Sequence, residues 1–223
     1  MKKTITFILL FASFYLQAQN IGIFAGGGLG NFRLSDDMSD GKNSDYIFTY
    51  YAGFNFENTI VERQLYFQLG LQAISQGSSG NSDSIYYFMN AVYIPLELKY
   101  KYFFSKRGEG YVFVSGGPFF SAFYKGTKTD IALEDAAAAD TTGRITFDPD
   151  IKFGKLFTDD FSPFDYGIHT SLGYGYDHLQ VTYNLSFGLA DILTSEQQEF
   201  FGDESFIKTI NHSLTIAYYF SNK

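Results

Sequence analysis

Cysteine and tryptophan are absent from this chain of 223 residues, and proline occurs only four times. Without cysteine, disulfides cannot stabilise the fold, and the lipid anchor that exported bacterial proteins carry on a cysteine is excluded. Beyond the N-terminal region, no stretch reaches the 18 or so apolar residues that a transmembrane helix needs. The low proline content, together with 22 glycines and 20% aromatic residues, is typical of extended strands.

Positive charge is also scarce in this chain. Lys and Arg number 16 against 24 Asp and Glu, which gives a net charge of −8 at pH 7. Nucleic-acid binding requires a basic surface, so the composition argues against a nucleic-acid partner. The length fits a single domain of ordinary size.

The first 18 residues have the organisation of a secretory signal peptide. A basic start (Lys2, Lys3) precedes an apolar stretch, and the small residue Ala18 follows that stretch. The apolar stretch is too short to span a membrane as a helix. We therefore expect residues 1–18 to be a signal peptide, cleaved after Ala18 or one residue later, and residues 19–223 to form the mature domain.

The rest of the chain alternates apolar side chains with small or polar ones in eight stretches. In the clearest stretch, the apolar side chains are Leu179, Val181, Tyr183, Leu185, Phe187 and Leu189. A period of two predicts a strand, because successive side chains point to opposite faces. The predicted strands cover residues 21–32, 46–56, 64–76, 84–104, 110–124, 164–176, 179–190 and 207–220. Since an apolar face repeats on every strand of an exported chain, we expect that face to meet a lipid bilayer.

Long and short connections alternate between these strands. The long class comprises residues 33–45, 77–83, 125–163 and 191–206, and the short class comprises residues 57–63, 105–109 and 177–178. Short periplasmic turns and longer external loops are typical of outer-membrane barrels. The sequence therefore predicts an all-β protein of the cell outer membrane, an eight-stranded antiparallel up-and-down transmembrane β-barrel with long extracellular loops.

The inward faces are expected to carry small residues, because side chains just fill the interior of an eight-stranded barrel. Glu97, Lys99 and Lys101 lie on the inner face of the fourth strand, where buried charges need partners. Asp165 and Asp177 on the sixth strand are the candidate partners. Tyr and Phe near the strand ends are expected to form aromatic girdles at the two membrane interfaces.

Two glycine-rich segments have structural interpretations. Residues 26–30 read GGGLG, which would suit a phosphate-binding loop only between a strand and a helix. Another strand is expected after them, so we interpret these glycines as easing strand curvature and close packing in the lumen. Residues 116–118 (Gly-Gly-Pro) predict a bulge or bend and leave the face assignment of the fifth strand open.

Asp165, His169, Ser171 and Asp177 share the inner face of the sixth strand. A Ser/His/Asp triad in a membrane barrel would make a lipid hydrolase or acyltransferase, but a triad is recognised by its geometry, and any polar inner face groups such residues. No spacing singles them out. We therefore expect no catalytic, cofactor-binding or metal-binding residues, no cofactor and no enzymatic activity.

The first and third long connections are rich in carboxylates. They are Asp36, Asp37, Asp40 and Asp45 in the first, and Glu134, Asp135, Asp140, Asp148, Asp150, Asp159 and Asp160 in the third. Calcium needs six to eight oxygens at fixed spacing, and these acids follow no EF-hand-like pattern. The third connection is still the best functional candidate because of its length. Within it, residues 136–139 could form a short helix.

Several segments resemble the porin-like or PorT-like family of outer-membrane β-barrels from Gram-negative envelopes. They are LQAQN, IGIFAGGGLGNF, YIPLELKYKYF, YVFVSGGPFFSAFY, FDYGIHTSLGYGY, LQVTYNLSFGLADI and SLTIAYYF. The resemblance covers nearly the whole mature chain and implies an integral outer-membrane barrel without catalytic residues. It also implies a role linked to protein secretion, adhesion or envelope integrity. Many such barrels end in an aromatic residue, whereas Ser221, Asn222 and Lys223 follow Phe220 here.

Our leading hypothesis is a monomeric, non-catalytic structural or interaction protein. Its partners would be the lipid bilayer and a protein bound at residues 125–163 and 191–206. A soluble, lipocalin-like barrel that binds a lipid inside is the first alternative. A lipid-acting enzyme that uses His169 and Ser171 is the second, and a small diffusion pore lined by Lys99 is the third.

Overall fold

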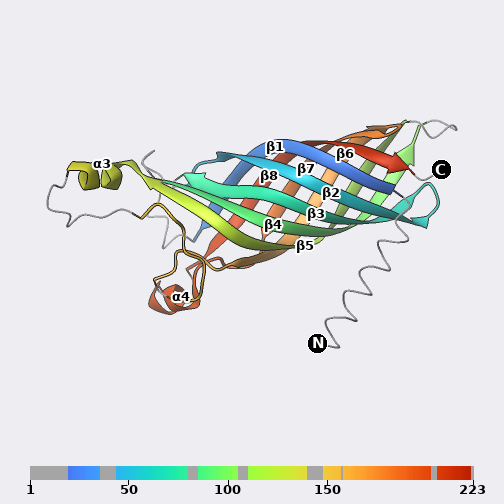
Figure 1. Ribbon diagram of the computed structural model, residues 1–223. Helices are drawn as coiled ribbons and strands as arrows, with labels where there is room; N and C mark the ends of the chain where they lie inside the picture. Colours follow the sequence, from blue (N-terminus) through green and yellow to red (C-terminus); the bar gives the residue numbers. More distant parts are fainter. Residues whose placement is uncertain are drawn as a thin grey trace, which may run out of the picture.

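The computed structural model describes residues 20–35, 44–79, 85–104, 110–139, 148–156, 158–201 and 205–221. Eight antiparallel strands close into one barrel in chain order (Figure 1). They are β1 (Asn20–Leu34), β2 (Ile47–Val61), β3 (Leu65–Ser79), β4 (Ile85–Phe103), β5 (Gly110–Asp130), β6 (Phe164–Tyr176), β7 (Leu179–Gly188) and β8 (Ile207–Ser221). The predicted fold is confirmed.

Two helices lie in the connections at one end of the barrel, α3 (Ile131–Ala139) after β5 and α4 (Ser195–Phe201) after β7. β8 ends at the opposite end (Figure 1). Among the described residues, neither of these helices nor any other is long and apolar enough to cross a membrane. The signal-peptide prediction for residues 1–18 lies outside the described residues.

The barrel closes where β1 pairs with β8, from Asn20 opposite Ser221 to Leu34 opposite Ile207. Several strands are longer than the sequence predicts, because pairing with a neighbour extends them into the expected loops. Thus β2 continues beyond residue 56 to Val61, and β5 continues beyond residue 124 to Asp130.

The predicted bulge at residues 116–118 is wrong. Gly116, Gly117 and Pro118 pair in regular register with β6, and the register shift between β4 and β5 lies at Asn90 and Ala91 instead. Glycine is required at 117 by close packing, because a Cβ there would lie 1.9 Å from the Leu96 carbonyl oxygen. The inward side of β5 is therefore the same from Tyr111 to Phe123 and changes only at the register shift, where Tyr124 and Lys125 are both exposed and Gly126 is buried.

The apolar rows predicted to face lipid lie on the outside of the barrel. On β7, Leu179, Val181, Tyr183 and Phe187 are exposed, whereas the alternating polar side chains are mostly buried. Leu189, just after the strand, is exposed as well. This confirms the predicted orientation of the row that starts at Leu179.

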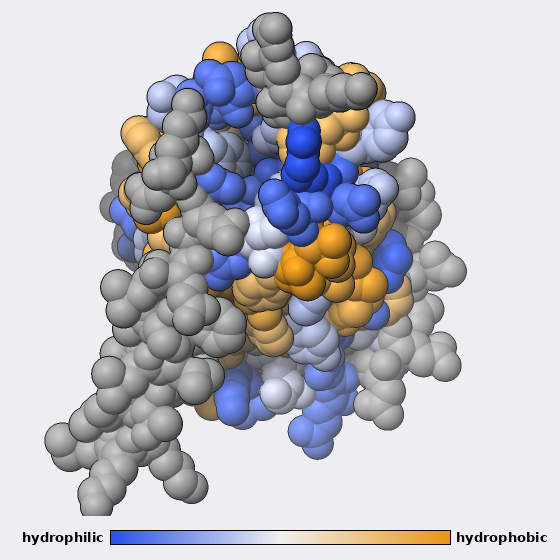
Figure 2. All heavy atoms as spheres, turned by 90° about the vertical axis from the view of Figure 1, so that its right-hand side faces the viewer, coloured by the Kyte–Doolittle hydropathy of each residue, from blue (hydrophilic) through white to orange (hydrophobic). Residues whose placement is uncertain are grey.

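Many exposed aromatic side chains, though not Phe54 or Tyr183, fall into two groups at different heights on the outer wall. One group is Tyr46, Phe48, Tyr50, Tyr86, Tyr124, Phe164 and Tyr166, and the other is Tyr100, Tyr102, Phe104, Tyr174, Tyr176, Tyr218 and Phe220. On β6, Tyr166 and Tyr176 are separated by ten residues, which span about 25 Å along the barrel axis for a strand tilted by about 40°. That separation matches the apolar band of an outer-membrane barrel. Figure 2 shows the end nearer the second group, where hydrophobic side chains lie beside hydrophilic ones.

The lumen contains larger side chains than the sequence analysis predicts. Phe24, Tyr51, Tyr93, Phe119 and Phe123 are buried in one core cluster, together with Ile74 and Met89. Small residues make room for them on neighbouring strands. Residues 26–30 lie within β1, so the phosphate-loop interpretation is excluded. At Gly28, an added Cβ would lie 1.9 Å from the His212 carbonyl oxygen, which confirms the close-packing interpretation.

Candidate functional site

Two lysines of β4 share one glutamate of β2 inside the barrel. Lys99 Nζ lies 3.1 Å from Glu57 Oε2, and Lys101 Nζ lies 2.5 Å from Glu57 Oε1. All three side chains are buried. The prediction that Asp165 or Asp177 neutralises these lysines is therefore wrong. The expected second strand ends one residue before Glu57, whereas the actual strand continues and its alternation turns this side chain inward.

Neutral groups complete the surroundings of the two ammonium ions. Lys99 donates to the side-chain oxygens of Gln68 (2.9 Å) and Gln180 (3.1 Å), and its Nζ lies 4.2 Å from the centre of the Phe113 ring. Lys101 Nζ lies 4.1 Å from the centre of the Tyr66 ring. Since each charge is held by several protein groups, this cluster is built as a structural ion-pair network.

The four polar residues of β6 do not form one site. Asp177 lies in the β6–β7 turn with a φ of 53°, and its side chain is exposed near His178. Asp165 lies at the other end of the strand and accepts a hydrogen bond from Thr209 (2.6 Å). The predicted inward orientation holds for Asp165, His169 and Ser171, which are buried. Asp165 and Asp177 lie at opposite ends of β6, away from the other two residues in its middle.

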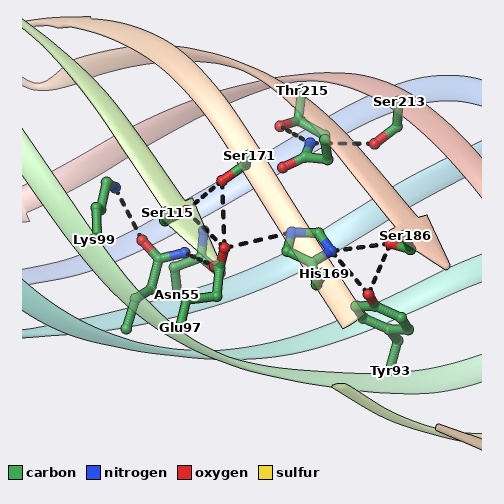
Figure 3. Close-up of polar contacts among 12 residues, drawn as sticks. Asn55, Tyr93, Glu97, Lys99, Ser115, His169, Ser171, Ser186, Ser213 and Thr215 are labelled. Atoms are coloured by element: carbon green, nitrogen blue, oxygen red, sulfur yellow. Dashed lines mark hydrogen bonds and ion pairs between the residues drawn. The ribbon is translucent and has the colours of Figure 1, made fainter. Parts of the chain in front are cut away.

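His169 lies at the centre of a second network, which Figure 3 shows. Its Nδ1 lies 2.8 Å from the Tyr93 hydroxyl and 2.9 Å from Ser186 Oγ, and its Nε2 lies 3.5 Å from Glu97 Oε1. Ser171 instead contacts Ser115, and it donates to Glu97. The serine and the acid that contact His169 are thus Ser186 and Glu97, and not the expected partner Ser171. Sequence reasoning missed this Ser186–His169–Glu97 arrangement because its members come from three strands.

This arrangement has the residue types of a hydrolytic triad but no room for a substrate. Ser186, His169 and Glu97 are each at most 4% exposed. The adjoining cavity, lined by His169, Glu97 and Ser171 among others, has a volume of about 20 Å³. Such a volume holds one or two waters, whereas small-molecule sites have roughly 300–1,000 Å³. In the part of the chain that the structure describes, no group of three or more acidic or histidine side chains could hold a metal ion.

The end of the barrel that carries the helices has larger cavities than the lumen beside His169. A cavity of about 320 Å³ opens there, lined by the rings of Phe32, Tyr87 and Phe161 and by residues of the α4 segment. That segment is tied to the barrel by Asp191, whose Oδ1 accepts hydrogen bonds from the backbone of Leu193 and Ile207, both at 3.0 Å.

A capping box begins helix α4. The Thr194 backbone donates to the Gln197 side chain (3.1 Å), and the Gln197 backbone donates to the Thr194 hydroxyl (3.3 Å). This reciprocal pair satisfies backbone donors at the start of the helix. The connection after β7 is therefore held in place by specific hydrogen bonds.

The third long connection is also built from specific contacts. Asp130 accepts the Leu133 backbone N–H (3.0 Å) at the start of α3, and Lys128 pairs with Asp160 (2.7 Å). The helix predicted at residues 136–139 is confirmed and begins earlier, at Ile131. A hydrogen bond from Lys152 lowers the pKa of the exposed Asp148 carboxyl. Some residues named in the sequence analysis lie outside the described residues. They are Asp36, Asp37, Asp40 and Asp140, residues 105–109, and parts of the four long connections.

A family comparison agrees with this geometry. Residues 17–194 match the family described as outer membrane protein beta-barrel domain. The chain belongs to this family. A protein of the outer membrane barrel family with this closed eight-stranded fold is an outer-membrane protein, which confirms the predicted localisation.

Solved structures with the same type of barrel are only distantly similar. OprG of Pseudomonas aeruginosa is 14% identical, with 92% of this chain and 97% of that chain covered and a TM-score of 0.48. Ail of Yersinia pestis is 10% identical (90% and 98% covered, TM-score 0.45), and the outer membrane enzyme PagL is 9% identical (89% and 98%, TM-score 0.46). No curated protein matches the chain. At such low similarity, these structures carry no argument about function.

Proposed function

We propose that this outer-membrane barrel is a non-catalytic and non-conducting protein that acts through its extracellular loops. The role would be in envelope integrity, adhesion or protein secretion, as the narrower porin-like or PorT-like assignment implies. The proposal includes export by a signal peptide at residues 1–18 and a monomeric state. One observation carries the proposal. The lumen is filled by side chains, whereas the α3 and α4 connections at one end of the barrel are held in place by specific hydrogen bonds.

The filled lumen weighs against the alternative functions. A diffusion pore needs an open path, whereas the cavity beside Glu97 and His169, within the described part of the barrel, has a volume of about 20 Å³. An enzyme that uses His169 needs access for a lipid, and His169 is 4% exposed. A lipocalin-like barrel keeps its apolar side chains inside, whereas here Leu172, Leu214 and others are exposed outside.

The loop end offers apolar contact points among many carboxylates. Ile131 and Leu133 on α3 are exposed, as are Leu156 and Phe200 in the neighbouring segments. Exposed apolar side chains at the rim of a rigid scaffold are typical of protein contact sites. We therefore assign the binding surface to the α3 and α4 connections.

Complementation tests this assignment. A strain lacking the protein would receive either the natural chain or a variant in which residues 131–139 are replaced by a Gly/Ser linker of equal length. We expect the loop variant to behave like the empty strain in surface adhesion and detergent sensitivity, because the barrel remains but its contact surface is lost.

The matched control is Asp177→Asn in the short turn at the opposite end, which should complement fully. A heat-modifiable shift on a detergent gel would show that each variant is folded in the outer membrane. Full complementation by the folded loop variant would contradict the proposal.

A further inference from the structure

Two positive charges lie directly opposite each other on the outer wall of the β1–β8 seam. Arg33 of β1 pairs in register with Lys208 of β8. Their neighbours Phe32 and Thr209 are buried, so alternation turns both cations outward. Like charges directly opposite on neighbouring strands are destabilising. This pair is notable in a chain whose net charge is −8.

One aromatic ring, that of Phe206, lies beside both cations. Arg33 Cζ lies 5.4 Å and Lys208 Nζ lies 4.7 Å from the centre of the Phe206 ring. In the part of the chain that the structure describes, neither cation forms an ion pair within 4 Å. Asp191, which bonds to the residue next to Lys208, is occupied by uncharged N–H donors.

The cation pair lies at the height of lipid headgroups. From Lys208, β8 continues to Tyr218 in the aromatic group at the other end, a distance of ten residues or about 25 Å along the barrel axis. The outward side chains between them include Leu214 and Ile216, which are more than half exposed. Lys208 and Arg33 therefore lie at the upper edge of the apolar band, on the side of the extracellular loops.

We propose that Arg33 and Lys208 bind the phosphate group of an outer-leaflet lipid. A guanidinium forms paired hydrogen bonds with phosphate oxygens, and an ammonium beside it adds a second charge. An anion between the two cations removes their mutual repulsion. The apolar wall directly below them, with Leu29, Leu214 and Ile216, fits acyl chains, so the geometry favours a lipid-borne phosphate over a free one.

Native mass spectrometry of the refolded mature barrel in neutral micelles tests this site. The probe is dimyristoyl phosphatidic acid, compared with dimyristoylglycerol, which lacks the phosphate, and with inorganic phosphate. We expect the natural chain to retain phosphatidic acid only. The double variant Arg33→Gln/Lys208→Gln should bind it about tenfold more weakly, since two charge-assisted contacts are lost.

The control is Lys125→Gln/Lys155→Gln, which removes the same charge from exposed positions elsewhere and should retain binding. All variants must keep the heat-modifiable shift of the folded barrel. Equal binding by the Arg33/Lys208 variant, or equal loss in the control, would overturn the proposal. Displacement of phosphatidic acid by an equal concentration of inorganic phosphate would indicate a free-phosphate site and overturn the lipid assignment.

Discussion

Buried charge is the feature of individual residues that sequence reasoning reached only in part. The alternation along β4 correctly predicted that Glu97, Lys99 and Lys101 point inward. Their partner could not be found in the same way, because residues that meet across a lumen are brought together by the stagger of the strands. Glu57 also lies beyond the expected end of its strand, and only pairing between β2 and β3 extends that strand past it.

Replacing Glu57 tests how much this network contributes to the free energy of unfolding. Glu57→Gln leaves two buried lysines without their shared counter-charge, and breaking a buried pair in this way costs about 3–5 kcal/mol. We expect that loss in the free energy of unfolding, measured by urea titration of the barrel in lipid vesicles. Adding Lys99→Met and Lys101→Met should restore most of it, because the unpaired charges are then removed.

Asp177→Asn in the exposed turn serves as the control and should change the free energy of unfolding by less than about 0.5 kcal/mol. An unchanged stability of Glu57→Gln would show that the three side chains are not coupled inside the barrel.

Single strands were the part of the structure that the sequence predicted best. A period of two identifies both the strand and its lipid-facing side, as the row that starts at Leu179 illustrates. Strand ends were less predictable, because polar residues such as Ser78 of β3 and Lys128 of β5 join the ladders through pairing with Tyr87 of β4. In the Gly116–Pro118 segment, glycine serves close packing with Leu96 instead of a bulge, and the sequence alone does not distinguish these two roles.

Arginine substitutions along β6 test the membrane position of a strand. Leu172 lies in the apolar band between Tyr166 and Tyr176, and 61% of it is exposed. Leu172→Arg should lower the free energy of unfolding by about 2–4 kcal/mol, whereas Tyr176→Arg at the interface should lower it by about 0–1 kcal/mol. Urea titration in vesicles measures both. Equal costs at the two depths would be incompatible with a bilayer around this wall.

For the whole molecule, the alternation of long and short connections predicted a closed barrel with its loops at one end. Packing inside the cylinder was not predictable from the pattern, because Tyr93 and Phe119, which stack with ring centres 4.7 Å apart, come from strands whose stagger sets the contact. The same holds for the Ser186–His169–Glu97 cluster. A pattern on one strand gives the direction of a side chain, whereas its neighbours depend on all eight strands.

The most direct test uses the absence of cysteine from the natural chain. Single cysteines placed in turn at residues 179–189 would carry a spin label, and the refolded barrel in lipid vesicles would be probed with oxygen and with a water-soluble nickel complex. We predict that odd-numbered positions are reached by oxygen from the lipid, while even-numbered positions are shielded from both. Odd-numbered positions open to the nickel complex, or no period of two along β7, would contradict a barrel that meets lipid outside and is filled inside.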